Sequence, residues 1–394
     1  MIMNENKAIF PLGMYDQPQD DDEWTSWTEA GINLVRCRNE EEVEEAHRRG
    51  MMAWVPVPLA CWKTGDEEAL GEMIRSLRDQ PSIIAWEAQD EAIWNACRLD
   101  DGIVTNRIWA QPSRVKAAIR SRLDALVEGL KRGSSVAREL DPGRSLWLNE
   151  AAKSDQDTLA RCLPYLDIVS YDYYPVPEDP RRGRQMRMLG GFTDMFRRTA
   201  STRDLWVVEQ AFSWGGLSRA SNDKQGQIHE YNSNTWIPMT EEESTSYPGL
   251  AELRFMSWIA ICHGATGLLW FGSGFEDRPS PLLHDLMLLI GELHEVQPFL
   301  TAGNVPSVRA TTSEKQCPSI SGVSAIARRS GDDTLLALVN EDFVEHDVMV
   351  TGLEWIDADD LVPMFDLVDE LRSTNSGYVT RMKGQETRLY LSRS

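Results

Sequence analysis

One repeated pattern governs the first 300 residues of this 394-residue chain: a short apolar run, then an amphipathic stretch, then another apolar run. The apolar runs predict eight strands, at residues 8–15, 32–38, 52–58, 82–89, 145–150, 166–174, 205–210 and 267–272. Helical spacing of apolar residues is clear at 40–50, 65–79, 112–140, 250–265 and 280–300. Strands that alternate with helices form parallel sheets with right-handed crossovers. Eight of them in this length predict the α/β class and a (β/α)8 TIM barrel.

An open, doubly wound sheet is the competing architecture. Such a sheet would be expected to carry a glycine-rich phosphate turn directly after its first strand. The sequence "PLGMYDQ" at that place offers none, and neither a GxGxxG nor a Walker sequence occurs elsewhere. The barrel is therefore favoured.

The pattern of apolar and turn residues changes near residue 300. Residues 301–308 read as a linker, and short strands separated by turn residues follow, in "SAIARR", "TLLALVNED", "HDVMVTGL", "SGYVTRM" and "TRLYLS". This pattern is typical of a small antiparallel β-sandwich. We therefore divide the chain into a catalytic barrel at residues 1–303 and a β-sandwich domain at residues 304–394.

Charge narrows the range of partners. The formal net charge is −22 and the pI is about 4.7, which disfavours nucleic acid and anionic membranes and suits a neutral substrate. No apolar run has the length of a membrane span, and no signal peptide is visible at the N-terminus. The six cysteines form no CxxC pair and read as reduced thiols, which favours a cytoplasmic location. The sequence does not indicate an oligomeric state.

Two carboxylate-bearing strand ends carry the chemistry. The fourth strand ends in "AWEAQDEA", with Asp90 and Glu91, and the seventh in "LWVVEQ", with Glu209. The C-terminal strand ends of a barrel meet at its active-site mouth, where strands 4 and 7 stand opposite each other. Glycoside hydrolysis needs two facing carboxyls, one to protonate the departing oxygen and one to attack or to activate water. Glu91 and Glu209 are therefore the predicted catalytic residues.

Other interpretations of these carboxylates stay open. A glutamate at a strand end is often only an ion-pair partner, although an unpaired charge inside "LWVVEQ" would be costly. Glu87 lies earlier in the fourth strand and is an alternative acid, and Glu150 ends the fifth strand. Asp90 next to Glu91 would raise the pKa of the acid by its negative charge.

The order of these residues resembles clan A of the glycoside hydrolases, the retaining (β/α)8-barrel glycosidases, over residues 1–300. The resemblance also takes in Arg36 in "INLVRCR", the ending "VSYDYYP" with Tyr173 or Tyr174, and Trp270 in "HGATGLLWFG". The clan commonly has Asn directly before the acid/base, where it bonds the sugar 2-hydroxyl. Here Asp90 takes that position as a predicted substrate-binding residue, and the difference means that the resemblance does not identify the sugar.

What the resemblance implies is a double displacement. Glu209 would attack the sugar, and Glu91 would donate a proton and later take one from water. Arg36 would keep Glu209 ionised, one of the two tyrosines would donate a hydrogen bond to it, and Trp270 would line the −1 subsite. A β-linked, glucan- or galactan-like oligo- or polysaccharide is the implied substrate.

Tryptophans extend the substrate-binding prediction. The chain has 14, and those at or after the C-terminal strand ends are candidate platforms for sugar rings: Trp62, Trp86, Trp94, Trp214, Trp236 and Trp270. Trp214 and Trp270 are favoured, with core packing as the competing interpretation. No cofactor or metal is expected, because the histidines do not lie at strand ends. The alternative functions are a catalytically inactive barrel that binds carbohydrate, a metal-dependent hydrolase, and a glycan- or partner-binding β-module.

Overall fold

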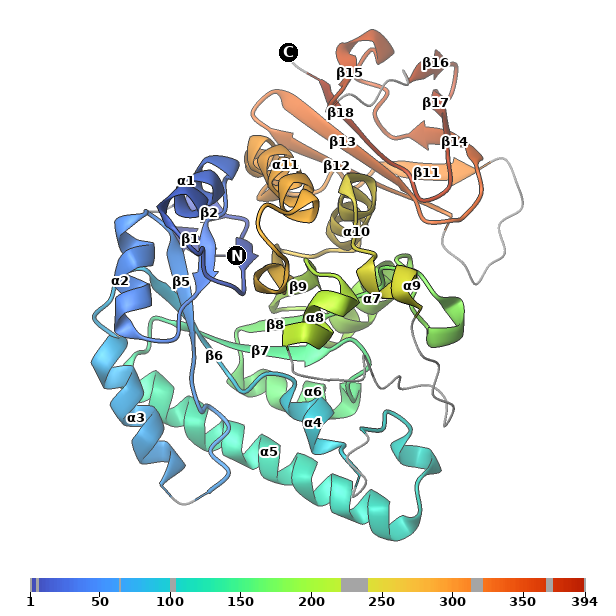
Figure 1. Ribbon diagram of the computed structural model, residues 1–394. Helices are drawn as coiled ribbons and strands as arrows, with labels where there is room; N and C mark the ends of the chain where they lie inside the picture. Colours follow the sequence, from blue (N-terminus) through green and yellow to red (C-terminus); the bar gives the residue numbers. More distant parts are fainter. Residues whose placement is uncertain are drawn as a thin grey trace.

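The protein was analysed as a computed structural model that describes residues 2–4, 7–63, 65–99, 104–220, 240–312, 322–365 and 371–392. Eight parallel strands close into a barrel in the order β10-β3-β4-β5-β6-β7-β8-β9 (Figure 1). Their bounds are β3 (Leu12–Met14), β4 (Leu34–Arg36), β5 (Met52–Pro56), β6 (Ile83–Glu87), β7 (Ser145–Ala151), β8 (Ile168–Asp172), β9 (Asp204–Gln210) and β10 (Gly267–Phe271). An antiparallel hairpin of β1 (Ile2–Asn4) and β2 (Lys7–Ile9) precedes them. The predicted (β/α)8 barrel is confirmed.

Helices follow the strands around the barrel. Those of nine residues or more are α1 (Asp21–Ala30), α2 (Glu40–Arg48), α3 (Asp66–Leu77), α5 (Ser113–Leu140), α7 (Met188–Thr199), α10 (Leu250–Cys262) and α11 (Pro281–Glu295). The shorter ones are α4 (Ala92–Ala96), α6 (Gln156–Cys162), α8 (Trp214–Ala220), α9 (Glu241–Thr245) and α12 (Gln297–Leu300). The 3-10 turns are η1 (Ile108–Ala110), η2 (Leu163–Tyr165), η3 (Pro180–Arg182), η4 (Ser273–Phe275) and η5 (Ala358–Asp360). None of the described helices combines the length and apolar character that a membrane span requires.

The interior of the barrel is filled by aromatic side chains. Trp54, Trp147 and Trp206 pack edge to face, with ring centroids 5.3 and 4.8 Å apart, and Tyr15 caps them at 5.2 Å from Trp54. The three indoles are completely buried, so the barrel is solid below its mouth. A closed floor of this kind places any binding site at the strand ends above it.

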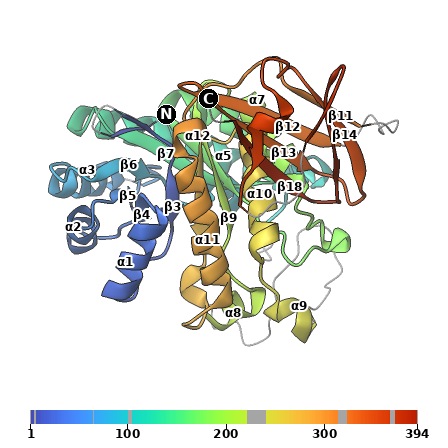
Figure 2. The ribbon, with the colours of Figure 1, turned by 90° about the horizontal axis from the view of Figure 1, so that it is seen from above.

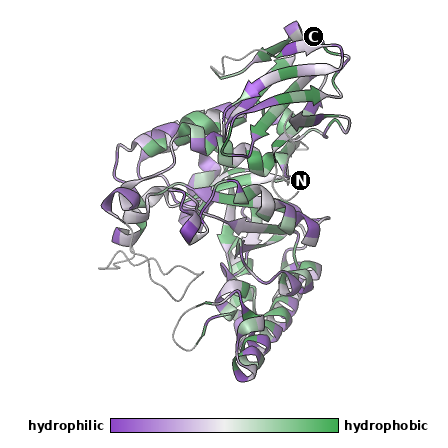
Figure 3. Cartoon of the chain, turned by 90° about the vertical axis from the view of Figure 1, so that its right-hand side faces the viewer, coloured by the Kyte–Doolittle hydropathy of each residue, from purple (hydrophilic) through white to green (hydrophobic). Residues whose placement is uncertain are grey.

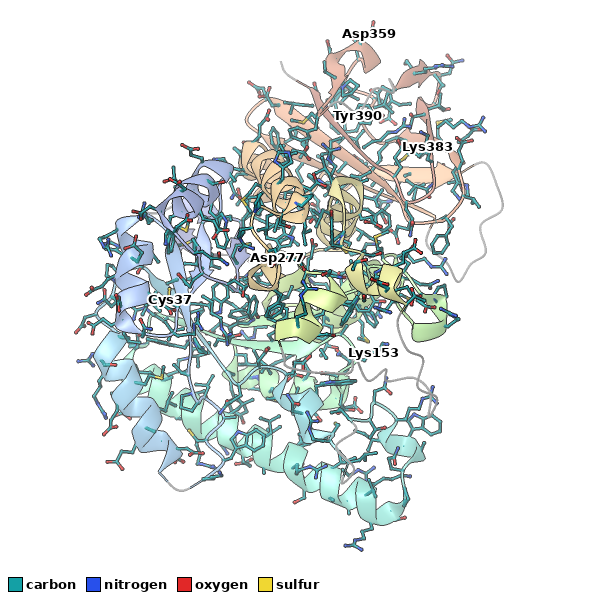
Figure 4. All side chains as sticks on the ribbon, in the orientation of Figure 1. Cys37, Lys153, Asp277, Asp359, Lys383 and Tyr390 are labelled. Carbon is teal, nitrogen blue, oxygen red and sulfur yellow. The ribbon has the colours of Figure 1, made fainter. Side chains whose placement is uncertain are left out.

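A β-sandwich follows the barrel, as predicted. One sheet has the order β11-β14-β17-β16 and the other β12-β13-β18-β15. Their bounds are β11 (Arg309–Thr312), β12 (Val323–Ser330), β13 (Asp333–Asn340), β14 (His346–Thr351), β15 (Leu361–Pro363), β16 (Arg372–Thr374), β17 (Gly377–Met382) and β18 (Thr387–Ser392). Tyr390 is buried between the sheets, whereas Asp359 and Lys383 lie at the outer ends of the domain (Figure 4). The exact division at residue 303/304 stays a prediction.

The sandwich is continuous with the barrel core. Leu335, Ala337 and Leu389 of the β12-β13-β18-β15 sheet belong to the same apolar cluster as the barrel helices. Helices α10 and α11 run side by side between the barrel and this sheet (Figures 1 and 2). Apolar segments accordingly run through the middle of the molecule, and polar ones lie on its outer helices (Figure 3).

Two long connections leave the C-terminal ends of strands. The segment after β6 contains α4 and η1, and the segment after β9 contains α8 and α9. The cysteines within the described residues, Cys37, Cys61, Cys97, Cys162 and Cys262, are free thiols.

Candidate functional site

The floor of the mouth is an ion pair on β4 and β6. Arg36 Nε lies 3.0 Å from Glu87 Oε2, which also accepts a 3.2 Å hydrogen bond from the Trp54 indole. The Tyr15 hydroxyl lies 3.4 Å from the other Glu87 oxygen. Burial raises the pKa of Glu87 to about 7, against the opposing effect of Arg36. Glu87 has no exposed surface and holds Arg36 at the mouth through the ion pair.

Asp90 and Glu91 lie at the solvent edge above that floor, on the turn that follows β6. Glu91 has φ 48° and ψ 40°, in the left-handed region, and its amide donates to the Asn149 carbonyl at 3.0 Å. Non-glycine residues in that region are uncommon and concentrate at functional sites. Asp90 is exposed and Glu91 partly exposed, so both carboxyls are accessible to a ligand.

Glu150 explains why the chain holds this turn. Its side chain points out of the barrel and accepts hydrogen bonds from the amides of Ile93 at 2.7 Å and Trp94 at 3.1 Å. These are first-turn amides of α4, which have no partner inside the helix. A third hydrogen bond comes from the Ser154 hydroxyl at 2.7 Å. Glu150 is thus the cap of α4 and not the acid that the sequence left open.

Asn149 joins two carboxyls at the mouth. Its side-chain amide donates to Asp90 Oδ1 at 2.9 Å and to Asp172 Oδ2 at 3.0 Å. Asp172, at the end of β8, is nearly buried, and its carboxyl hydrogen-bonds that of Glu91. Two carboxyls can share a hydrogen bond only when one of them holds a proton.

The pKa of Glu91 suits proton transfer. Burial, followed by the negative charge of Asp90, raises it to about 7. Burial together with the charges of Glu91 and Asp90 also raises the pKa of Asp172 well above its ordinary value. The Glu91–Asp172 pair therefore holds a proton near neutral pH, in a place that solvent reaches. A general acid needs this combination.

Aromatic rings form one wall beside these carboxyls. Tyr174 stacks on Phe271 with centroids 5.7 Å apart and meets Phe212 edge to face at 5.0 Å. Trp214 packs on Phe212 at 5.2 Å, and its indole donates to the Val176 carbonyl at 2.8 Å. The structure thus places Tyr174 and Trp214, two of the predicted substrate-binding residues, in one group with Phe212.

Glu209 does not face Glu91, which corrects the predicted catalytic pair. Along β9, Trp206 and Val208 point into the barrel, whereas Leu205 and Val207 pack with the outer helices. Glu209 shares the outward face, and its Oε2 accepts a 2.7 Å hydrogen bond from Ser257 of α10. It is completely buried, and burial raises its pKa to about 8. Glu209 thus belongs to the helix–sheet interface, where burial favours its protonated form.

The positions of three further predicted site residues also differ from the prediction. Trp270, its neighbour in the β9–β10 register, is also buried on the outer face and does not line the mouth. Tyr173 faces outward, donates to the Gly183 carbonyl at 2.9 Å and packs on Phe192 of α7. Arg36 does lie at the mouth but pairs with Glu87 instead of Glu209.

Sequence reasoning missed Asn149 and Asp172. Both are polar residues near the ends of apolar strands, in "SLWLNE" and "VSYDYYP", which is the signal that selected Asp90 and Glu91. Both also lie on the inward face of their strands, next to residues of the barrel interior. The other candidate tryptophans vary: Trp62 is exposed, Trp86 and Trp94 are buried, and Trp236 lies outside the described residues. No group of described His, Cys, Asp and Glu side chains is arranged to hold a metal ion.

Comparisons with known proteins support the fold. No family model matches the sequence, and no curated protein does. Among solved structures, Gan42B, a GH42 β-galactosidase from G. stearothermophilus, has a TM-score of 0.61 at 9% identity and covers 98% of each chain. An α-amylase from Geobacillus thermoleovorans has a TM-score of 0.57 at 10% identity, with 98% of this chain and 100% of that one covered.

A third likeness concerns a longer protein. The β-galactosidase of Halorubrum lacusprofundi has a TM-score of 0.50 at 16% identity, over 73% of this chain. This chain spans only 58% of the length of that β-galactosidase. At such identities the likenesses establish a TIM barrel with a C-terminal β-sandwich, and enzymes that differ in substrate share it.

Proposed function

We propose that the protein is a glycoside hydrolase in which Glu91 is the general acid and Asp90 the second carboxylate. The observation that carries the proposal is that Glu91 is partly exposed at the mouth of a (β/α)8 barrel, next to the exposed Asp90. The pKa of Glu91 is raised there to about 7. Asp172 shares the proton of Glu91. A hydrogen-bonded pair is closer than the ~5 Å or more that separates an acid from its catalytic partner, so Glu91 and Asp172 act as one unit.

The substrate we propose is a β-linked, glucan- or galactan-like glycan. Tyr174 is partly exposed and is supported from behind by Phe212 and Phe271, so it offers an aromatic face on which sugar C–H groups pack. The β-galactosidases among the proteins of similar fold support this choice over an α-linked glycan, and the α-amylase among them is the reason to test both. Retention, which the resemblance to clan A implies, would need a nucleophile other than Glu209.

The test is hydrolysis of aryl β- and α-glycosides, β-glucans and galactans by the wild type and by Glu91→Gln, Asp90→Asn and Glu209→Gln. We expect Glu91→Gln to lose about 100- to 10,000-fold in turnover. Glu209→Gln should keep turnover near that of the wild type. Loss of turnover in Glu209→Gln, with azide rescue of Glu209→Ala, would overturn the assignment and favour Glu209 as the nucleophile.

A second candidate function is a barrel that binds a glycan without cleaving it. The observation in its favour is that the inward side chains at the mouth end of β9 are Val208 and Gln210, neither of which is a carboxylate. Gln210 instead holds the backbone of Val176, with hydrogen bonds of 2.9 and 2.7 Å. Calorimetric binding of a glycan that the wild type leaves intact would support this second function.

A further inference from the structure

A chain of buried hydrogen bonds runs through the barrel interior and ends at the candidate site. The Trp147 indole donates to Ser170 Oγ at 2.7 Å, and the Ser170 hydroxyl donates to Asn149 Oδ1 at 2.7 Å. Asn149 then donates to Asp90 and Asp172. Trp147, Ser170 and Asn149 are almost completely buried, so solvent cannot replace any of these bonds.

The direction of this chain follows from its first member. An indole N–H can donate but not accept, so Ser170 Oγ must be the acceptor of the bond from Trp147. The Ser170 hydrogen is then free to point to Asn149, which fixes the amide oxygen of Asn149 on the Ser170 side. The NH2 group of Asn149 must consequently face the two carboxyls, and its two hydrogens are both in use.

We propose that Asn149, oriented by Ser170 and Trp147, is a positioning residue with two effects. It holds Asp90 ionised, and it keeps the proton of the Glu91–Asp172 pair between the two carboxyls. The reason is that Asp172 Oδ2 accepts from Asn149 and therefore carries no proton. A proton on Asp172 must sit on its other oxygen, from which it is available to Glu91. The inference rests on the proposed function of Glu91 as the acid.

Other charged and titratable groups lie around Asp90 and the Glu91–Asp172 pair and set the background for a test. They are Arg36 and Glu87 on the floor, Arg98 beyond Glu91, Glu150 behind α4, and Asp16 and Tyr174 across the mouth. Asn149 donates to both aspartates, and each hydrogen bond stabilises the charged form of its carboxyl. Loss of these bonds would let Asp90 take up a proton at higher pH. The negative charge that raises the pKa of Glu91 would then weaken.

The experiment measures the titration of Glu91 in the full chain by carbon-13 NMR of labelled glutamate carboxyls, assigned by comparison with Glu91→Gln. The variants are Asn149→Ala, Ser170→Ala and Ser170→Thr, which keeps the hydroxyl. Ser82→Ala is the control, because Ser82 is also buried but lies before the start of β6, where its hydroxyl donates to the Val43 carbonyl. The pH profile of kcat is recorded alongside.

We expect Asn149→Ala and Ser170→Ala to lower the pKa of Glu91 by about one unit, with the alkaline limb of kcat moving equally. Ser170→Thr should restore both, and Ser82→Ala should change neither. An unchanged titration of Glu91 in a folded Ser170→Ala or Asn149→Ala variant would overturn the positioning role, whatever happens to stability. A wild type without glycosidase activity would contradict the proposed function. The positioning role of Asn149 could still be tested, because the NMR titration needs no turnover.

Discussion

At the scale of single residues, Glu209 shows how burial decides the role of a carboxyl. Burial disfavours its charged form, and the hydrogen bonds from Ser257 and Trp270 offset that effect only in part. With its pKa raised to about 8, Glu209 is neutral at pH 7 and resembles a glutamine. A catalytic nucleophile would need to be ionised at that pH.

Substitution of Glu209 tests this state. Its pKa is about 8 in the folded protein and about 4.5 in the unfolded chain, so the folded state binds the extra proton between these values. Stability from this group is greatest below pH 4.5 and decreases as the pH rises to about 8. Urea denaturation of Glu209→Gln should show a shallower decrease over that range than the wild type. Glu209→Ala, which leaves a cavity, should lose about 2–4 kcal/mol relative to the wild type below pH 4.5. That loss should shrink as the pH rises to about 8, because alanine carries no titrating group.

The pKa of Glu91 is also raised, to about 7, but Glu91 is accessible to a ligand. The prediction for Glu91 therefore concerns the rate of catalysis. If Glu91 donates the proton, kcat should decrease about tenfold per pH unit above about 7, where it ionises. Asp90→Asn removes the neighbouring charge that contributes to the shift, so the residual turnover should show this limb at lower pH. A limb that stays in place in Asp90→Asn would mean that another group carries the proton.

At the scale of elements, the sequence was informative about strands and helices but not about the faces of strands. The eight barrel strands were predictable because each is a short apolar run between helical stretches. A barrel strand is apolar on both faces, since one packs inside the barrel and the other against helices. The alternation that would show which face Glu209 occupies is therefore absent from "LWVVEQ". A one-residue change of register moves every side chain to the opposite face.

The same reasoning separates the predicted site residues that reach the mouth of the barrel from those that do not. Glu91 and Asp90 lie on the turn beyond β6, where the backbone leaves the sheet and both can reach the mouth. Tyr173 and Tyr174 are adjacent, so only one of them could point to the mouth, and the sequence left that choice open. Asn149 and Asp172 meet only because β7 and β8 are neighbours in register, which no local pattern contains.

Close packing of α5 on the β5–α3 connection gives a prediction about an element. A Cβ on Gly133 would lie 1.8 Å from the Leu59 carbonyl oxygen, which is part of the backbone and cannot move aside cheaply. Gly133→Ala should therefore destabilise the protein by about 1–3 kcal/mol. The control is Gly291→Ala in α11, where a Cβ meets nothing within 4 Å and a gain of about 0.5–1 kcal/mol is expected. Thermal denaturation of both variants measures the difference.

At the scale of the whole molecule, the sandwich completes the core of the barrel. Helix α10 is buried nearly all round, because one side faces β9 and the other faces β12, β13 and β18. A helix that is apolar on every side requires cover on every side. The barrel and the sandwich should therefore unfold in one transition. Two separate calorimetric transitions would show that the shared cluster does not couple them.

An ionic contact at the edge of the junction between barrel and sandwich gives the last prediction. His263, after α10, contacts Asp194 of α7 through Nδ1 and Glu341 of the sandwich through Nε2, each at 2.9 Å. Burial would lower the pKa of His263, but the two carboxylates outweigh it and raise the pKa to about 9. Glu341 is buried, so removal of the imidazolium takes a cationic partner away from a carboxylate inside the protein.

The pH dependence of stability identifies this contact. Since the pKa of His263 is about 9 when folded and about 6.5 when unfolded, its contribution is complete below pH 6.5 and lost as the pH rises to 9. His263→Asn should be less stable than the wild type by about 3–5 kcal/mol at pH 6. That difference should shrink at pH 9.5. His47→Asn, on the exposed face of α2, should match the wild type at both pH values. A difference for His263→Asn that is equal at pH 6 and 9.5 would mean that the imidazole packs at the junction without carrying charge across it.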